Sequence, residues 1–295
     1  MATGRIYKAL SGFFYVKEND SLLPCRARGK FKHEGVTPLV GDEVEYISTG
    51  GQGIIDAVLP RKNEFLRPPV ANLDVLVIIA SRAIPVTDPF LVDKMTAIAE
   101  HNGVEPVVLV NKSDLIIGSS FADIYRRAGF KTVETSAETG EGIDELRELL
   151  RGKLCAFTGN SGVGKSSLLN ALDDSFSIAV SDVSLKLGRG KHTTRHVELH
   201  ETKDGAIIAD TPGFSSFDTE SADLRRAEDL QYAFRDFAPY IGECRFTGCS
   251  HTKEQDCAVL SALREGRIEP TRHESYVRLY EKLKEKKEWE HKKGL

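Results

Sequence analysis

The chain has 295 residues, of which 40 % are hydrophobic and 28 % charged, and its net charge is −4 at pH 7. This length predicts two or three domains, and the balance is typical of globular proteins with a buried core. No stretch reaches the roughly 18 uninterrupted apolar residues of a membrane helix, and residues 1–30 lack the apolar block of a secretion signal. We therefore expect a soluble, cytoplasmic protein rather than a membrane or secreted one.

The charge is distributed unevenly along the chain. Residues 1–68 carry a net charge of +2 and residues 271–295 carry +3, so the segment between them carries −9. Basic ends on an acidic centre permit an anionic partner that the overall charge would not suggest. Residues 282–293, at the basic C-terminal end, are predicted to lie on a helix. This helix end is either an RNA contact or an ordinary solvated surface.

Residues 1–67 are predicted to form a small OB-like β-barrel, because short strands alternate there with turn signals. The strands are expected around Ile6–Val16, Ser21–Phe31, Asp42–Ile47 and Gly53–Leu59. In a strand through residues 25–32, alternate side chains share one face, and here they are Arg26, Arg28, Lys30 and Lys32. Such a stripe indicates an RNA-binding surface, although the solvated face of a half-buried strand shows the same alternation.

Residues 68–217 alternate predicted strands and helices, which indicates an α/β domain with a largely parallel sheet. The rigid Arg67-Pro68-Pro69 segment marks its start. Strands are expected at about 74–81, 106–110, 131–134, 154–158, 197–201 and 206–209, and helices at about 89–103, 121–129, 143–151 and from 165. Residues 218–295 are predicted to form a mainly helical domain that contains a cluster of cysteines and whose last helix covers about 271–293.

The most specific motif lies between a predicted strand and a predicted helix. It reads Gly159-Asn160-Ser161-Gly162-Val163-Gly164-Lys165-Ser166, followed by Ser167. It matches the loop GxxxxGK[ST], whose backbone N–H groups face the β-phosphate at a helix N-terminus. Lys165 would bridge the β- and γ-phosphates, and the Ser166 hydroxyl would hold Mg²⁺. We therefore expect a nucleoside triphosphate site; the alternative is a Gly-rich turn with a purely structural role.

Two further motifs follow predicted strands and indicate guanine as the base. In Asn111-Lys112-Ser113-Asp114, the Asp114 carboxylate can accept from guanine N1–H and the exocyclic amine, which adenine does not offer in that arrangement. Lys112 can lie along the base plane, and Asn111 can link loops. The segment Thr135-Ser136-Ala137 would bring a backbone N–H to guanine O6.

The γ-phosphate sensor is predicted at Asp210-Thr211-Pro212-Gly213, which begins 45 residues after Lys165. Asp210 would act on Mg²⁺ through water, and the Gly213 N–H would contact the γ-phosphate. Residues 183–197 form either a mobile basic loop, in which Thr193 or Thr194 binds Mg²⁺, or an ordinary solvated loop. Ordinary GTPases carry the phosphate loop before the guanine motif, so the reversed order here predicts a circularly permuted domain.

Five cysteines are present, and three of them lie close together with a histidine. Three thiolates and one imidazole fit a closed, tetrahedral structural zinc site, and the residues are Cys244, Cys249, His251 and Cys257. Unrelated buried cysteines are the alternative. Cys25 and Cys155 fall on predicted apolar strand faces and are expected in the core.

The permuted motif order, the N-terminal barrel and the zinc spacing together resemble the circularly permuted, ribosome small-subunit-dependent GTPase A family of bacteria. The resemblance covers nearly the whole chain. It implies a GTPase that acts late in small ribosomal subunit maturation, binds ribosomal RNA and is stimulated by the subunit. We expect hydrolysis to promote release from the subunit, and we expect the protein to be a monomer.

The family lacks the glutamine that usually follows the D-x-x-G motif, and Phe214 stands at that position here. An apolar side chain cannot orient the attacking water. The family places a histidine just before the switch threonines, and His192 occupies this position. The resemblance therefore leads to the hypothesis that His192 positions the water while Lys165 and Mg²⁺ offset the developing charge; a solvated loop histidine is the alternative.

Two other functions would use part of these motifs. A P-loop metabolic kinase shares the phosphate loop but does not explain the guanine and D-x-x-G motifs on successive strand ends. A zinc-stabilised RNA-binding module could use GTP structurally, but it would not require Lys165, Ser166, a switch threonine and Asp210.

Overall fold

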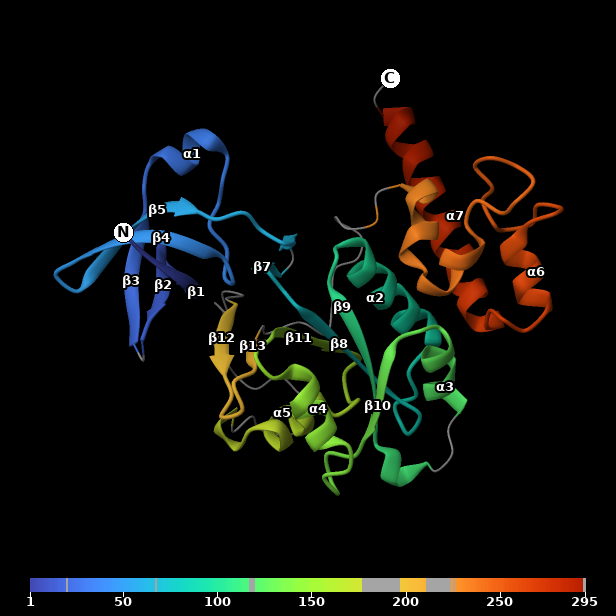
Figure 1. Ribbon diagram of the computed structural model, residues 1–295, viewed down its shortest axis with the longest axis horizontal. Helices are drawn as coiled ribbons and strands as arrows, with labels where there is room; N and C mark the ends of the chain where they lie inside the picture. Colours follow the sequence, from blue (N-terminus) through green and yellow to red (C-terminus); the bar gives the residue numbers. More distant parts are fainter. Residues whose placement is uncertain are drawn as a thin grey trace.

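The computed structural model describes residues 1–19, 21–66, 68–116, 120–176, 197–210, 224 and 226–293. A β-barrel, a central α/β unit and a helical C-terminal unit lie side by side (Figure 1). Within these ranges, every helix is too short or too polar to cross a membrane.

The N-terminal unit is a closed barrel of five strands. They are β1 (Ala2–Leu10), β2 (Phe13–Glu18), β3 (Ser21–Ala27), β4 (Glu43–Thr49) and β5 (Gln52–Val58). The order β1-β2-β3-β5-β4 closes because β4 also pairs with β1, and only β3 and β5 run parallel. Ile6, Val16, Cys25, Val44 and Ile55 are fully buried inside. The predicted OB-like barrel and the core position of Cys25 are confirmed.

The first predicted strand is divided into β1 and β2 by a two-residue turn. Ser11 and Gly12 both have positive φ angles, of 51° and 81°. Two consecutive residues with positive φ connect antiparallel strands whose twist they match. The apolar residues on both sides of this turn concealed it in the sequence.

The predicted basic strand at residues 25–32 is wrong beyond Ala27. There β3 ends, and α1 (Lys30–Glu34) follows, with Phe31 buried in its first turn. The helix ends at Gly35, whose φ of 67° suits its lack of a side chain. The alternation of apolar and basic residues over residues 25–32 therefore comes from two elements. Its first part is the end of β3, and its last part is the first turn of α1. The basic residues do not share one strand face.

In the described part of the central unit there are six strands. They are β8 (Val75–Ser81), β9 (Glu105–Asn111), β10 (Lys131–Thr135), β11 (Leu154–Gly159), β12 (Glu198–Glu201) and β13 (Ile207–Asp210). Their order is β10-β9-β8-β11-β13-β12, parallel except for β12. At the predicted domain boundary, β6 (Glu64–Leu66) and β7 (Pro69–Ala71) pair with each other.

Helices cover both faces of this sheet. They are α2 (Pro89–His101), α3 (Ser120–Arg127), α4 (Ile143–Leu150) and α5 (Lys165–Leu172), with the short 3₁₀ turns η1 (Ser113–Leu115) and η2 (Asp174–Phe176). The α2–α3 layer packs on Leu76 and Ile78 of β8, whereas the α4–α5 layer packs on Val77 and Ile79. Because successive strand residues face opposite sides, the uninterrupted apolar run of β8 fills two cores.

The C-terminal unit packs against α2. It contains the 3₁₀ segments η3 (Ala227–Ala233) and η4 (Arg235–Tyr240) and the helices α6 (Ala258–Arg264) and α7 (Pro270–Lys293). The rings of Phe234, Phe237 and Tyr276 contact one another. They belong to a hydrophobic cluster that also contains Ala97 of α2. The predicted last helix is confirmed.

One short pairing joins the barrel to the central sheet. In Figure 1, β12 lies next to the barrel, and its Glu198 is paired with Lys8 of β1 in antiparallel register. The Lys8 ammonium lies 2.8 Å from a Glu198 carboxylate oxygen. Lys17 of β2 forms an ion pair with Glu201 at the other end of β12. We call this junction the β1–β12 seam.

Candidate nucleotide and metal sites

The predicted nucleotide motifs follow strands at one edge of the central sheet. Residues 159–164 leave β11, residues 111–114 end β9, and residues 135–137 end β10. These strands are parallel, so their carboxyl ends lie at the same edge. Ligands of open α/β sheets bind at this edge.

Asn111 connects three of these segments. Its Nδ2 donates to the carbonyl oxygen of Val163 in the phosphate loop at 2.8 Å. Its Oδ1 accepts from the Thr135 hydroxyl at 3.2 Å and from the Ala137 N–H at 3.3 Å. The side chain is buried, and these bonds use both ends of its amide. The phosphate loop and both predicted guanine loops are therefore held together by one residue.

The predicted phosphate loop needs glycine at two positions where a neighbouring side chain or backbone group comes close. Gly164 has a φ of 95°, and a Cβ there would lie 2.3 Å from the Asn111 Nδ2 atom. Gly159 has a φ of 157°, and a Cβ there would lie 2.6 Å from the carbonyl oxygen of Ile79. Lys165 and Ser166 begin α5, so the loop leads into a helix N-terminus. This arrangement directs backbone N–H groups toward an anion.

The predicted guanine-binding residues lie in the loops that follow β9 and β10. Asp114 is exposed in η1, and Ser113 Oγ donates to a Glu141 carboxylate oxygen at 2.9 Å. Ser136 is buried, and its N–H donates to the Glu141 carbonyl. Residue Glu141 thus joins the two guanine loops from outside. Sequence reasoning missed it, and also the Thr135 hydroxyl, although Thr135 directly precedes Ser136.

Several predicted catalytic residues cannot be placed. His192, Thr193, Thr194 and Gly213 lie outside the described residues. Asp210 ends β13 next to β11, but its side chain is not described. The backbone of Asp210 is therefore at the expected edge of the sheet.

The predicted metal ligands are brought together in the C-terminal unit. Their ligand atoms lie within 4.8 Å of one another, and the residues are Cys244, Cys249, His251 and Cys257. The Nδ1 atom of His251 is 3.6 Å from Cys244 Sγ and 3.4 Å from Cys257 Sγ. Such a cluster could hold a metal ion.

Neighbouring side chains orient the histidine of this cluster. The His251 Nε2–H donates to Gln231 Oε1 at 2.9 Å, which leaves Nδ1 facing the sulfur atoms. Burial lowers the pKa of His251, so its neutral, metal-binding form is favoured. The His273 Nε2–H donates to the His251 carbonyl at 2.8 Å. Gln231, which lies 20 residues before His251, gave no local signal in the sequence.

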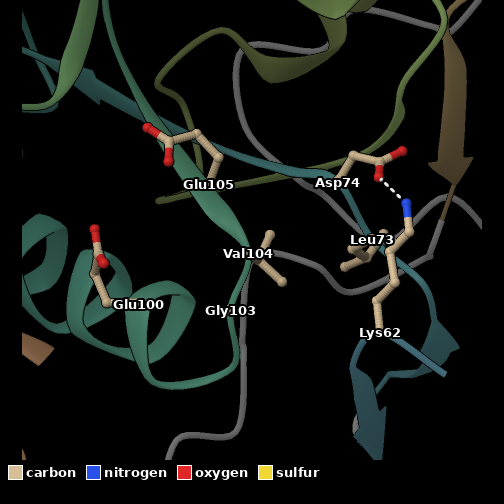
Figure 2. Close-up of a pocket in the computed structure, with 7 residues that line it drawn as sticks. All are labelled: Lys62, Leu73, Asp74, Glu100, Gly103, Val104 and Glu105. Atoms are coloured by element: carbon tan, nitrogen blue, oxygen red, sulfur yellow. Dashed lines mark hydrogen bonds and ion pairs between the residues drawn. The ribbon is translucent and has the colours of Figure 1, made fainter.

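A cleft of about 340 Å³ lies at the opposite edge of the sheet, where β8 and β9 begin (Figure 2). Lys62 forms an ion pair with Asp74 there at 2.9 Å. Glu100 and Glu105, on the other wall, both pair with Arg235 of the C-terminal unit. This cleft is separate from the predicted nucleotide motifs, which follow the carboxyl ends of the strands.

Comparison with known proteins identifies the family. The RsgA GTPase family model matches residues 58–220, and the RsgA N-terminal domain model matches residues 3–55. The chain belongs to the RsgA GTPase family. This confirms the predicted family and fold class, including the circular permutation.

Curated relatives align with this chain along almost their whole length. The protein named small ribosomal subunit biogenesis GTPase RsgA from Caldanaerobacter subterraneus subsp. tengcongensis is 42 % identical, with 98 % of both chains covered. Its namesake from Geobacillus thermodenitrificans is also 42 % identical, covering 97 % of this chain and 99 % of the relative.

Two solved structures share the fold of this chain. YjeQ from Thermotoga maritima is 34 % identical, with a TM-score of 0.80 over 95 % of this chain and 98 % of YjeQ. YloQ, described as a circularly permuted GTPase, has the same identity and TM-score over 97 % of this chain and 96 % of YloQ.

Proposed function

We propose that this chain hydrolyses GTP to GDP and phosphate during late maturation of the small ribosomal subunit, and that hydrolysis promotes its release. The observation that carries the proposal is Asn111, whose amide links the phosphate loop to both guanine loops. Full-length relatives named as small-subunit biogenesis GTPases support the choice of partner.

In this proposal, nucleotide recognition is divided between the loops. Backbone N–H groups of residues 162–166 bind the β-phosphate, and Lys165 bridges it to the γ-phosphate. Asp114 accepts from guanine N1–H and the exocyclic amine, and its exposure leaves it accessible to a base. The Ala137 N–H, whose bond to Asn111 Oδ1 is long at 3.3 Å, supplies the donor that meets guanine O6. The neighbouring Ser136 shapes this segment through its N–H bond to the Glu141 carbonyl.

Ser166 and Asp210, with Thr193 or Thr194, would hold Mg²⁺. The ion would neutralise charge on the phosphate oxygens. Ser166 lies in the first turn of α5, which follows the loop after β11, and β11 pairs in parallel with β13, which ends at Asp210. This shared edge of the sheet supports the assignment. His192 would position the attacking water, and Gly213 would contact the γ-phosphate.

We further propose that the metal of the C-terminal cluster is zinc. In a tetrahedral site with metal–sulfur bonds of about 2.3 Å, sulfur atoms lie about 3.8 Å apart. Cys244 Sγ and Cys257 Sγ are 3.8 Å apart. Four protein ligands leave no open position, so the ion would have a structural role.

The barrel is proposed to contact ribosomal RNA through basic residues near β3. Arg26 lies over the Phe13 ring at 4.6 Å, and a cleft of about 730 Å³ extends from these residues to residues 35–38. Arg28 is exposed, although it pairs with Asp56 at 2.9 Å. Lys30 adds charge at the start of α1. Arginine guanidinium planes and aromatic rings are both surfaces on which unpaired RNA bases stack.

The proposed domains span residues 1–67, 68–217 and 218–295, in a cytoplasmic monomer. The barrel would bind RNA, the permuted domain would hydrolyse GTP, and the helical domain would bind zinc. Basic groups at both ends would then flank the catalytic domain on the subunit.

The deciding experiment is the GTP turnover number of the full chain, measured with and without small ribosomal subunits. We expect slow turnover alone and a large rise with small subunits, but none with large subunits. The variant H192A should lose that rise while keeping its affinity for GDP. Turnover that small subunits do not change would contradict the proposal and favour a structural use of GTP.

A further inference from the structure

One strand of the nucleotide edge carries no assigned motif. β8 lies between β9, which leads into the guanine-binding residues, and β11, which leads into the phosphate loop. The segment that follows β8, residues 81–87, therefore lies between the two halves of the proposed nucleotide site. We call it the β8 loop.

The β8 loop is closed at its base by two buried hydroxyl side chains. The Thr87 N–H donates to the Ser81 carbonyl at 2.8 Å, and Thr87 Oγ1 accepts from the Ser81 N–H at 2.9 Å. Ser81 Oγ donates to the Ala83 carbonyl at 3.0 Å. Ser81 is 0 % exposed and Thr87 is 1 % exposed. Such buried hydrogen bonds fix the loop, because breaking them would leave polar groups unpaired.

The tip of the β8 loop contacts both neighbouring loops. Lys112 Nζ donates to the Ile84 carbonyl at 2.8 Å. On the other side, a Cβ added to Gly162 would lie 3.1 Å from two ring atoms of Pro85, so Pro85 lies directly on the phosphate loop. The loop thus spans the distance between the lysine of the guanine motif and the backbone of the phosphate site.

We propose that the β8 loop orients Lys112 for the purine base, and that Thr87 is the positioning residue that holds this loop in place. With its ammonium group on the Ile84 carbonyl, the lysine side chain is fixed at its far end. Its methylene groups can then lie along a base without first losing rotamer freedom. This inference rests on the proposed function, because it concerns the same nucleotide site.

The effect of this preorganisation on GDP affinity can be estimated. Fixing one long side chain before binding changes affinity by about two- to tenfold. We expect T87V to weaken GDP binding by that factor, because valine keeps the shape of threonine but cannot accept from the Ser81 N–H. T87S keeps the hydroxyl and should restore most of the affinity.

T202V is the matched control. Thr202 is also a buried threonine that closes a turn, with its Oγ1 accepting from the Ala206 N–H at 3.0 Å. This turn precedes β13, at the edge of the sheet opposite to the proposed nucleotide site. T202V and T87V should lower the melting temperature to a similar extent, but T202V should leave GDP affinity unchanged.

The decisive test is a double-mutant cycle with a fluorescent GDP analogue as the probe. If Thr87 acts through Lys112, T87V should weaken binding in the wild-type background but by less than about twofold in the K112A background. An equal loss in both backgrounds, or no loss in T87V, would overturn the inference. Failure of the wild-type chain to bind the analogue would instead contradict the proposed function.

Discussion

Asn111 is the residue on which the geometry of the proposed nucleotide site depends most. N111A would remove three hydrogen bonds and separate the phosphate loop from both guanine loops. Since a typical hydrogen bond contributes about 1 kcal/mol, we expect at least a tenfold loss of GDP affinity. Titration with a fluorescent GDP analogue measures this loss.

The control for N111A is N63A. Asn63 is also a buried asparagine that joins two segments, through bonds to the N–H and carbonyl of Leu73. It lies outside the nucleotide edge of the sheet, so N63A should lower stability and leave GDP affinity unchanged. If both variants lost GDP affinity equally, the specific role of Asn111 would be refuted.

Asp173 makes the stability of the central unit dependent on pH. Its burial alone would raise the pKa, but hydrogen bonds from the N–H groups of Lys203 and Ser175, at 2.7 Å and 2.9 Å, outweigh this and lower the pKa to about 2. Because the pKa of Asp173 is lower in the folded state than in the unfolded state, where it is near 3.9, the ionised carboxylate stabilises the fold above about pH 3.9. This stabilisation is lost as the pH falls toward 2.

D173N should therefore lower the melting temperature at pH 7, with the difference from wild type shrinking as the pH falls from 5 to 3. Thermal unfolding followed by circular dichroism at each pH measures this. A difference that is the same at pH 7 and pH 3 would show that the ionised carboxylate is not what stabilises the turn.

At the scale of elements, a buried ion-pair cluster fastens α7 to α2. Arg272 of α7 is fully buried and donates to Asp93 of α2 at 2.9 Å and to Asp236 of η4 at 2.6 Å. Within α7, the neighbouring His273 and Tyr276 donate to the backbone carbonyls of His251 and Ser250 beside the metal cluster. One helix therefore contacts both the central unit and the segment that carries the cysteine and histidine cluster.

R272M should lower the free energy of unfolding by about 3–5 kcal/mol, because it leaves two buried carboxylates without their cation. The control R267M removes an exposed arginine that pairs with Glu265, and such surface pairs contribute little. Denaturant unfolding of both variants tests this. A small loss in R272M would mean that Asp93 and Asp236 find water or other partners.

Elements with local patterns were predictable, whereas contacts between distant residues were not. The apolar run of β8 and the Asp88–Pro89 start of α2 follow from nearest-neighbour chemistry, and Asp88 indeed accepts from the Phe90 N–H. Arg272 and Asp93 are 179 residues apart, so no local pattern links them. The predicted strand to Lys32 failed because a period of two over few residues does not distinguish a strand from a strand end and one helical turn.

For the candidate nucleotide site, too, the sequence predicted the local motifs but not the contacts that distant residues make with them. Motif spacing placed the loops of Gly162, Asn111 and Ser136, since strand ends determine where they lie. It did not reveal the β8 loop, because Thr87 and Ser81 act through a fold contact rather than a motif. Gln231 was missed for the same reason.

At the scale of the whole molecule, the β1–β12 seam joins the barrel to the strand that follows residues 177–196. Lys8 lies opposite Glu198, so K8E would place two carboxylates face to face, which destabilises strand pairing. We expect several-fold faster hydrogen exchange at the backbone amides of β1 and β12, with the rest of the barrel unchanged.

The control for K8E is R151E, which reverses a charge that pairs with Glu148 within an exposed helical segment. Hydrogen exchange followed by mass spectrometry should show no change at the seam in R151E. Unchanged exchange in K8E would mean that the backbone pairing holds the two units without the ion pair.

The two strands of the seam are far apart in the sequence, so β1 is synthesised long before its partner β12. The barrel strands are complete at Val58, but Glu198 emerges 190 residues after Lys8. At 5–20 residues per second this delay is about 10–40 s, during which the end of β1 remains an open strand edge on a nascent chain. Unpaired edges invite aggregation, and a charged side chain blunts them. We therefore expect Lys8 to keep the nascent barrel from pairing edge to edge with other chains until Glu198 becomes its partner.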